Sequence, residues 1–303
     1  GCVTIDQIDA LVDIAGFAYS DQWGSTPVKN FSKLAKVYKA KGKPVILLPQ
    51  ALGPFEEDDS KRAFSRVLSN SDVVFARDEK SFKEARKLTE SKEKIYISPD
   101  ITLFYPKDVN IKTEFDGERY IVIVPNYRML DQGSKQWAGK YINLLTKITK
   151  WILDYSIPVK LVVHTSSGDD LTLAEQILKN INSEDLSMVS NQDPLELKRT
   201  ISNSFFLIGS RYHSLLAAFS HAVPSIAMGW SHKYELLFED FGIGELYIKN
   251  SENETEIRSK VDNLINININ IGYRKKIKNK LIDMRATNEE MWEKTRKILQ
   301  EIR

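Results

Sequence analysis

An arginine and a histidine, Arg211 and His213, stand one residue apart directly after the apolar run FFLIG (205–209). The segment that follows them, SLLAAFSHA (214–222), has the composition of a helix, and Ser210 is a suitable helix cap. The first turn of a helix offers free backbone N–H groups and the positive end of the helix dipole, and a guanidinium matches phosphate or carboxylate. We therefore predict an anion-binding segment, in which His213 could deliver a proton once the bound charge favours the imidazolium.

The same pair of residues also has a purely structural interpretation. Arg211 could form an ion pair with a structural carboxylate, and His213 could hydrogen-bond a neighbouring loop, because an Arg-x-His pattern alone has little specificity. The anion-binding interpretation gains weight because polar and charged residues follow several other apolar runs in the same way.

In the first half of the chain, the run DVVFA is followed by Arg77 and Asp78, and the run KIYISP is followed by Asp100. Arg77 would supply a second guanidinium for an anionic ligand. Asp78 or Asp100 could accept the proton of a hydroxyl as a catalytic base. The alternative is a structural network in which Arg77 pairs with one of the two carboxylates, since ion pairs inside a fold also gather such residues.

The second half of the chain holds four further candidate residues for contacts with a substrate. Asn126 and Arg128 follow the run YIVIVP, and His164 follows the run VKLVV. Lys233 lies near the start of a predicted helix after VPSIAMG, where a second cation would add to the attraction for an anion. Ordinary turn chemistry or surface exposure is the structural alternative for each of them.

Nine short, β-rich apolar runs alternate with segments whose apolar residues recur at helical spacing. The unbroken runs are typical of buried parallel strands rather than of half-exposed strands. They lie at residues 10–16, 44–50, 72–77, 94–100, 119–126, 159–164, 186–190, 205–210 and 223–229. The helical patterns between them lie at residues 29–42, 59–71, 80–90, 136–156 and 172–181. This alternation predicts an α/β fold of two doubly wound, Rossmann-like units, in which ligands bind beyond the carboxyl ends of the strands.

Polar and turn residues at 105–119 mark the predicted boundary between two domains. We expect an N-terminal domain at 1–115, a C-terminal domain at 116–272, and a helical tail at 273–303 that packs back across both. The Asn/Ile tract at 263–272 alternates like a strand, yet it adjoins the tail, and we interpret it as a helix or helix end.

The tail begins with a cluster of basic residues, which are Arg274, Lys275, Lys276, Lys278 and Lys280. We interpret this cluster as a solvated helix face, with contact to an anionic membrane surface as the alternative.

The composition argues against several classes of protein. A net charge of +2 over 303 residues gives no electrostatic footprint for nucleic acid. The single cysteine, Cys2, cannot form an internal disulfide, and the four histidines lack Cys or His neighbours at metal-ligand spacing, so we expect no metal. The longest apolar runs are too short to cross a bilayer, and no signal-peptide pattern follows Gly1. We expect a cytoplasmic protein, with attachment to the inner face of the membrane as an alternative, and a missing upstream segment.

Several motifs together resemble the polysaccharide pyruvyl transferase family. They are PQALGPF (49–55), FARDEKSF (75–82), SPD (98–100) and SRYHSLLAAFSHAVPSIAMGWSHKYELLFEDFG (210–242). The resemblance extends from about residue 9 to residue 248 and is most specific in the Arg-x-His helix, the Val-Pro-Ser-Ile strand and the lysine that follows. It implies a glycosyltransferase-B-like architecture of two Rossmann-like domains facing a cleft, with the acceptor on the N-terminal side and the donor on the C-terminal side.

The resemblance further implies transfer of a pyruvyl group from phosphoenolpyruvate to a sugar of a cell-surface glycan, with formation of a pyruvate ketal and no cofactor. Arg211 and His213 match the donor-binding residues of the family, and Arg77 matches a further donor arginine. We expect His213 to be the general acid and Asp78 or Asp100 to be the base. The chain departs from the family pattern at its start, where no Gly-Asn-x-Gly-Asp-like loop precedes IDALVDIAG, so the acceptor site is the least specified part.

Two other functions fit the same patterns. A nucleotide-sugar glycosyltransferase of the same architecture would also place basic residues beneath a phosphate. A non-catalytic partner in glycan assembly would keep the fold and leave the site idle. The sequence does not specify the acceptor sugar, its linkage or the oligomeric state.

Overall fold

The computed structural model describes residues 3–105, 118–131, 137, 139–164, 168–190, 193–229, 231–250 and 253–301. The chain forms two compact units, each built on a parallel β-sheet. Unit 1 comprises Gly1–Ile101 together with Ile282–Arg303, and unit 2 comprises Thr102–Leu281. The predicted boundary at 105–119 falls mostly on residues outside the described ranges, and the predicted tail divides its residues between the two units.

Unit 1 contains a four-stranded parallel sheet whose strands follow one another in chain order. The strands are β1 (Leu11–Asp13), β2 (Val45–Gln50), β3 (Val73–Ala76) and β4 (Ile95–Ile97). The helices are η1 (Ile5–Gln7), η2 (Asp21–Trp23), α1 (Ser25–Ala40), α2 (Asp58–Asn70), α3 (Glu79–Arg86) and η3 (Lys92–Lys94), and η4 (Ile101–Phe104) follows β4.

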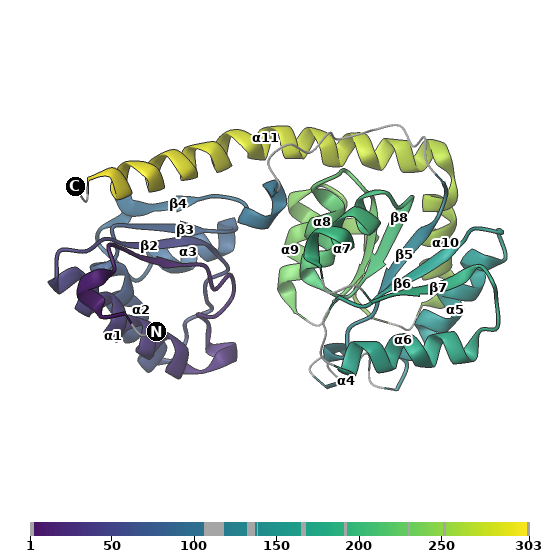
Figure 1. The fold of residues 1–303 in the computed structure, drawn as a ribbon, viewed down its shortest axis with the longest axis horizontal. Helices are drawn as coiled ribbons and strands as arrows, with labels where there is room; N and C mark the ends of the chain where they lie inside the picture. The colour runs from purple at the N-terminus through teal and green to yellow at the C-terminus, as the bar shows by residue number, and fades with distance from the viewer. Residues whose placement is uncertain are drawn as a thin grey trace. The chain divides into compact units, whose positions relative to one another are not determined.

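The three connecting helices of unit 1 cover the same face of its sheet (Figure 1). This is the expected outcome when parallel strands are added in sequence through right-handed crossovers. Buried residues of α1, α2 and α3, such as Phe31, Phe64 and Ala85, form one core with alternate residues of β2, including Val45 and Leu47. The remaining β2 residues point to the opposite face.

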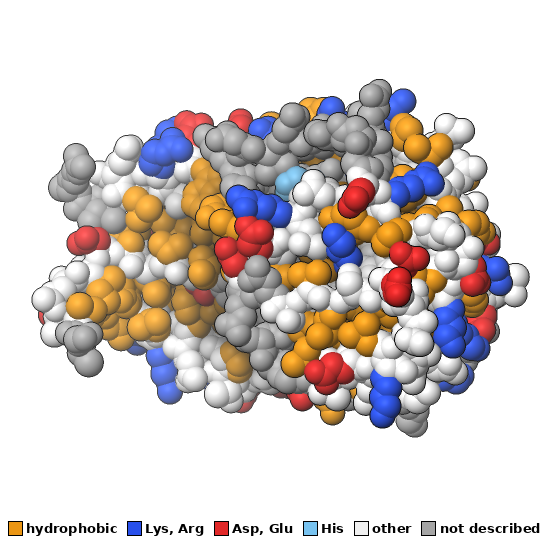
Figure 2. Space-filling model, turned by 45° about the vertical axis from the view of Figure 1, so that its right-hand side comes forward, with side chains coloured by type: hydrophobic (Ala, Val, Ile, Leu, Met, Phe, Trp, Pro, Cys, Tyr) orange, Lys and Arg blue, Asp and Glu red, His pale blue; other side chains and the backbone are white. Residues whose placement is uncertain are grey.

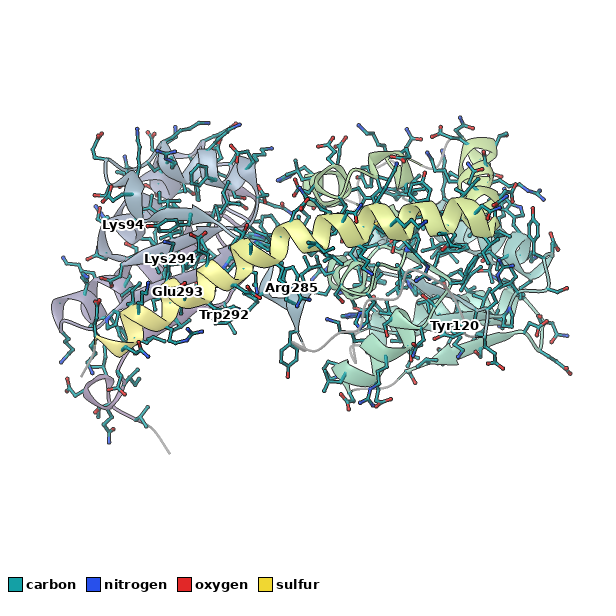
Figure 3. All side chains as sticks on the ribbon, turned by 90° about the horizontal axis from the view of Figure 1, so that it is seen from above. Lys94, Tyr120, Arg285, Trp292, Glu293 and Lys294 are labelled. Carbon is teal, nitrogen blue, oxygen red and sulfur yellow. The ribbon has the colours of Figure 1, made fainter. Side chains whose placement is uncertain are left out.

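The opposite face of the unit 1 sheet is covered by the C-terminal part of α11 (Ile267–Gln300). Met291 is 1% exposed and packs with Ile46 and Phe75. On the same stretch of helix, which Figure 3 shows with Lys294 labelled, the Nζ atom of Lys294 lies 4.5 Å from the centroid of the Tyr96 ring. A segment more than two hundred residues distant in sequence from Ile46 and Phe75 therefore completes the core of unit 1.

Unit 2 contains a six-stranded parallel sheet in the order β10-β9-β8-β5-β6-β7. Its strands are β5 (Ile121–Val124), β6 (Val159–Val162), β7 (Leu186–Val189), β8 (Phe206–Gly209), β9 (Ser225–Met228) and β10 (Tyr247–Ile248). Its helices are α4 (Arg128–Asp131), α5 (Tyr141–Leu153), α6 (Gly168–Asn180), α7 (Pro194–Ser202), α8 (Tyr212–Phe219), α9 (His232–Asp240), η5 (Gly244–Leu246), α10 (Glu254–Ile265) and the start of α11. Helices α7 and α8 lie on one side of this sheet, and α5 and α10 lie on the other (Figure 1).

The apolar runs of the sequence predict the sheets correctly. All nine predicted strands are present, and each lies within its predicted run. The central strands β5, β8 and β9 are buried at every position, as expected for a parallel sheet covered on both faces. The sequence analysis missed β10, whose two residues are too few to give a periodic signal. The α/β prediction is therefore confirmed.

The Asn/Ile tract is helical, as predicted, with a break between α10 and α11. Asn270, in the first turns of α11, is fully buried and donates from Nδ2 to the carbonyl oxygens of Phe205 and Leu264, at 3.2 Å and 3.1 Å. Its Oδ1 accepts a hydrogen bond of 3.0 Å from Nε of Arg274. The low-complexity tract thus supplies a polar group that the core of unit 2 requires.

Arg274 departs from the prediction for the basic cluster of the tail. Arg274 is 3% exposed, and its Nη2 donates to the carbonyl oxygens of Ser204 and Phe205 at 3.0 Å and 2.8 Å. Burial lowers the pKa of the guanidinium to about 10. The prediction of a solvated face is therefore wrong for this residue, because backbone carbonyls ahead of β8 need donors that water cannot supply.

None of the described helices combines the length and the apolarity needed to cross a membrane. On the face drawn in Figure 2, basic and acidic side chains are interspersed across the described residues, as the small net charge leads one to expect.

Replacing Arg274 by methionine should lower the free energy of unfolding by roughly 2–4 kcal/mol, because the carbonyls of Ser204 and Phe205 would lose a buried, charged donor. Thermal denaturation followed by circular dichroism measures this change. Lys275→Met, on the exposed side of the same helix turn, is the matched control and should change stability by less than about 0.5 kcal/mol. Equal effects of the two substitutions would contradict a structural role for Arg274.

Candidate functional site

The order of strands in unit 2 places a topological switch point between β5 and β8. From β5 the chain adds β6 and β7 on one side, and it then returns to add β8, β9 and β10 on the other. Residue Val124 of β5 lies beside Gly209 of β8, so the loops that leave these two strands begin next to each other and diverge. Crevices that bind ligands in open α/β sheets form at such points, outside the carboxyl ends of the strands.

Arg211 leaves β8 at this switch point and is held by a buried carboxylate. Its Nε lies 2.8 Å, and its Nη2 2.5 Å, from Oδ2 of Asp170 in α6. The Asp170 side chain is fully buried, whereas the Arg211 side chain is 24% exposed. The structural carboxylate that the sequence analysis considered as an alternative is thus present, yet the guanidinium still reaches the surface of unit 2.

Asp170 also fixes the loop that leaves β5. Its Oδ1 accepts a hydrogen bond of 2.9 Å from the backbone N–H of Tyr127. One buried carboxylate therefore binds the chain on both sides of the switch point, at Tyr127 and at Arg211. The sequence analysis did not identify this residue, because an aspartate in the first turn of a helix is explained well enough by the helix dipole.

Asn126 joins the same two loops through its amide group. Its Nδ2 donates to the carbonyl oxygen of Ser210 at 2.6 Å, and its Oδ1 accepts from the backbone N–H of Arg128 at 3.0 Å. The residue is 2% exposed. Both ends of the amide are thus engaged with backbone groups, so Asn126 positions Arg128, at the exposed start of α4, rather than reaching outward itself.

Ser210 does not cap α8 as predicted. The N-cap residue is Arg211, which has an extended backbone and makes no side-chain cap hydrogen bond. Ser210 is fully buried, and its carbonyl oxygen accepts a second hydrogen bond of 2.9 Å from the hydroxyl of Tyr234. The serine therefore belongs to the support beneath the loop, and the residue with the guanidinium stands at the start of the helix.

His213 is the second residue of α8 and is exposed, whereas His164 is half-buried at the end of β6. Burial, followed by the positive charges of His213 and Arg211, lowers the pKa of His164 to about 4. The three basic side chains are therefore near enough for their charges to interact. At neutral pH the imidazole of His164 is uncharged, so it can accept a hydrogen bond beside the Arg211 guanidinium.

Lys233, the second residue of α9, lies on the same side of the sheet. Its Nζ is 5.2 Å from the ring centroid of Tyr212 and 5.5 Å from that of Tyr234. The position of Tyr234 depends on Gly229, because a Cβ atom at residue 229 would lie only 2.4 Å from Cγ of the tyrosine. The glycine after β9 thus allows the tyrosine, and with it the start of α9, to approach the end of β8.

The predicted residues of unit 1 gather at the carboxyl edge of its own sheet. Arg77 and Asp100 form a buried ion pair, with 3.1 Å between Nη1 and Oδ2 and side chains 7% and 8% exposed. Asp78 instead caps α3, where its Oδ1 accepts a hydrogen bond of 2.7 Å from the backbone N–H of Ser81. Of the two pairings considered for Arg77, the structure has the one with Asp100.

A further polar cluster at this edge was missed by the sequence analysis. Oδ2 of Asp13, at the end of β1, accepts hydrogen bonds from the Tyr19 hydroxyl at 2.8 Å and from Nε2 of Gln50 at 2.7 Å. Gln50 is the last residue of β2 and is fully buried. The signal that could have identified both residues is the same as for Arg77, namely a polar side chain at the carboxyl end of an apolar run.

Within unit 2 the arrangement is suited to a small anion with more than one acidic group. Arg211 and Lys233 supply positive charge at the starts of two helices, and His213 and neutral His164 add imidazole groups. Among the described residues, no cluster of three or more His, Cys, Asp or Glu side chains could hold a metal ion. The roles of these residues in binding and catalysis remain predictions.

Three solved structures of differently named proteins are similar to this chain in fold. Accessory secretory proteins 1, 2 and 3 of Streptococcus pneumoniae match at 11% identity over 92% of this chain and 57% of theirs, with a TM-score of 0.55. UDP-GlcNAc 2-epimerase of Methanocaldococcus jannaschii matches at 13% identity over 77% and 66%, with a TM-score of 0.54. UDP-forming α,α-trehalose-phosphate synthase of Burkholderia xenovorans matches at 9% identity over 93% and 78%, with a TM-score of 0.53.

These similarities concern the fold, which is that of the glycosyltransferase-B class with two Rossmann-like domains. This chain spans a little more than half of the length of the Streptococcus pneumoniae chain that it matches. The family comparison is more specific than the fold, because the model of the polysaccharide pyruvyl transferases matches residues 8–232. That range contains the Arg-x-His segment, the Arg77 segment and all strands from β1 to β9. The chain therefore belongs to the polysaccharide pyruvyl transferase family.

Proposed function

We propose that this protein transfers a pyruvyl group from phosphoenolpyruvate to two hydroxyls of a sugar in a cell-surface glycan, forming a cyclic ketal and releasing phosphate. The observation that carries the proposal is the pair of cations at the carboxyl ends of β8 and β9, Arg211 and Lys233, with the imidazole of His213 in the first turn of α8. Phosphoenolpyruvate is compact and carries both a phosphate and a carboxylate. A fixed guanidinium with a neighbouring cation at a helix start suits such a ligand.

The ion pair with Asp170 supports this proposal more than it weakens it. Because the carboxylate engages Nε and Nη2, the plane of the Arg211 guanidinium is set before any ligand arrives. Fixed donors of this kind stabilise an anion without the cost of reorganising at the moment of binding. The exposed quarter of the side chain is the part that a phosphate or carboxylate would meet.

We assign the proton transfer to the methylene carbon of the donor to His213. Protonation of this carbon turns the methylene group into a methyl group and leaves an oxocarbenium-like centre at the adjacent carbon. One sugar hydroxyl then adds to this centre and loses its proton. The phosphate leaves, the second hydroxyl adds and loses its proton, and the ring closes. Of the two protons released, one replaces the proton taken from His213 and the other leaves with phosphate.

His164 is assigned a different role from His213, since with a pKa of about 4 it is not an imidazolium at neutral pH and cannot act as a general acid. We propose that it accepts a hydrogen bond from the donor substrate or from an acceptor hydroxyl. Asn126 and Arg128 contribute through the loop after β5, where Asn126 holds the backbone of Arg128.

A base for the sugar hydroxyls is proposed at Asp78 or Asp100 of unit 1. Asp100 is buried and engaged by Arg77, so its oxygens are less accessible to a sugar hydroxyl. Asp78 is half-buried and is therefore the candidate that we favour, even though one of its oxygens accepts from Ser81.

A nucleotide-sugar glycosyltransferase is the second candidate function, because several proteins of similar fold are named for UDP or UDP-sugars. The same cations would attract a diphosphate. Differential scanning fluorimetry with phosphoenolpyruvate and with UDP-GlcNAc separates the two functions. A rise in melting temperature with phosphoenolpyruvate alone supports the pyruvyl transferase. A rise with UDP-GlcNAc alone contradicts it, and a rise with neither favours a non-catalytic protein.

Arg211→Lys should raise the Kd for phosphoenolpyruvate about 10- to 100-fold, because lysine keeps the charge but loses the planar fork. Isothermal titration calorimetry measures the affinity. Lysine is preferable to alanine here, since alanine would leave Asp170 buried without its cation and cost about 3–5 kcal/mol of stability. Arg199→Lys, an exposed arginine on α7, is the matched control. An unchanged Kd in Arg211→Lys would remove this residue from the donor site.

His213→Gln should lower kcat at least about 100-fold, because glutamine offers a hydrogen bond but no transferable proton. The Kd for phosphoenolpyruvate should change by less than about threefold, since glutamine preserves the polar contact. Phosphate release measured over a range of donor concentrations gives kcat, and calorimetry gives the Kd. A variant with normal kcat would show that another group protonates the donor.

His164→Gln tests the assignment of a neutral imidazole. Because the pKa of His164 is about 4, this group stays unprotonated from pH 5 upward. The shape of the kcat profile between pH 5.5 and 8.5 should therefore be the same in this variant as in the original protein, although its height should fall. A measured profile that loses an inflection near pH 6–7 in His164→Gln would mean that His164 titrates in that range.

A further inference from the structure

Unit 1 carries a groove that the proposed reaction does not use. The groove has a volume of about 700 Å³ and lies between helix α2 and the segment 87–91 that follows α3. This volume is in the range of sites that bind small molecules or short chain segments. Its lining comes from the length of a helix and from the loop before β4, so it is separate from the strand ends that hold Arg77 and Asp100.

The groove is positively charged. Its basic lining residues are Lys61, Arg62, Arg66 and Lys87, and the acidic residue among the described lining residues is Glu90. This excess stands out in a protein whose net charge is only +2. An anion in the groove would meet a local excess of positive charge.

Of the four cations, Lys61 and Arg66 have their charge available for a ligand. Arg62 pairs with Asp59 between two exposed side chains, where pairing contributes little, and Lys87, whose side chain is 65% exposed, pairs with Glu84. Lys61 and Arg66 form no ion pair with any residue in the described part of the chain. Arg62 and Arg66 are also four residues apart on one helix, where like charges repel and an anion between them would relieve the repulsion.

Hydroxyl groups line much of the rest of the groove, and two of them have partners in the protein: Ser69 Oγ donates to the Ser65 carbonyl oxygen at 2.9 Å, and Thr89 Oγ1 accepts from the Ser91 backbone N–H at 3.1 Å. Ser65 and Ser69 continue the helical row that starts at Lys61, at intervals of four residues, and Thr89 and Ser91 lie on the opposite wall. Serine and threonine hydroxyls both donate and accept hydrogen bonds, as sugar hydroxyls do. Cations together with hydroxyls fit a polyhydroxylated ligand that bears acidic groups.

Other anionic partners fit less well. No aromatic side chain is present among the described lining residues, whereas single-stranded nucleic acids are usually held by stacking as well as charge. Leu88, the apolar lining residue, is half-buried and packs against the core of unit 1, so the groove offers no exposed apolar side chain for insertion into a bilayer.

We propose that this groove binds an anionic stretch of glycan, with carboxylates against Lys61 and Arg66 and sugar hydroxyls against the serine row. The nature of the glycan rests on the proposed function, because each pyruvate ketal adds one carboxylate to the polymer. A chain that already carries ketals would thus be held outside the reacting site, while a further part of the same polymer is presented for transfer.

The test uses binding without turnover. Fluorescently labelled oligogalacturonate, a uronic acid chain, is titrated with the whole protein in the absence of phosphoenolpyruvate, and maltohexaose serves as the neutral comparison. We expect the uronate to bind, its Kd to rise with NaCl concentration, and maltohexaose to bind at least 10-fold more weakly. Equal binding of the two sugars would overturn the proposal, as would no binding of the uronate.

Charge reversal locates the site. Lys61→Glu/Arg66→Glu should raise the Kd for oligogalacturonate at least 10-fold. Lys33→Glu/Lys36→Glu, two exposed lysines of α1 with no ion pair among the described residues, change the net charge equally and should raise it less than threefold. Circular dichroism melting checks that both variants are folded. Equal effects of the two pairs would overturn the proposal. So would a Lys61→Glu/Arg66→Glu variant that loses binding to phosphatidylglycerol vesicles but retains binding to oligogalacturonate.

The outcome is independent of the donor site. If the protein fails to bind phosphoenolpyruvate but binds uronate through Lys61 and Arg66, the proposed function is wrong and the proposed binding role of the groove is supported. If phosphoenolpyruvate is consumed but Lys61→Glu/Arg66→Glu leaves uronate binding unchanged, the proposed binding role of the groove is wrong and the proposed function is supported.

Discussion

The ion pair between Arg211 and Asp170 is the interaction on which the organisation of the candidate site depends. A carboxylate with no exposure is costly unless charged and polar donors satisfy it, and here the donors come from both loops of the switch point. The requirement works in both directions. The buried anion needs the guanidinium, and the guanidinium obtains from it a fixed plane and direction.

The sheets explain why charged residues collect where they do. Strands that are buried on both faces leave no room for polar side chains along their length, so such residues are confined to the strand ends and the loops beyond them. In unit 1, Asp13, Gln50, Arg77 and Asp100 likewise lie at or just beyond the ends of four successive strands.

Much of the fold could be predicted from sequence, because unbroken apolar runs and helical spacing are local signals. The same local signals placed Arg211 and His213 beyond β8 correctly. They could not identify Asp170, since its importance comes from a contact with a residue 41 positions away. They also misjudged Arg274, because a lysine-rich neighbourhood indicates solvent, whereas the burial of this one residue is decided by carbonyls near β8. A single sequence gives no local signal for the distant residues with which its charged groups will pair.

The packing of Met291 against Ile46 and Phe75 has a consequence for how the protein is made. One face of the first sheet receives its apolar cover from a helix that leaves the ribosome only after the whole of unit 2 has been synthesised. Until then, that face must remain exposed to water or be shielded by a chaperone, even though its strands were translated first. The strands of unit 1 are thus translated long before the helix that completes their core. While the N-terminal half is nascent and this apolar face is uncovered, the chain is most at risk of aggregation.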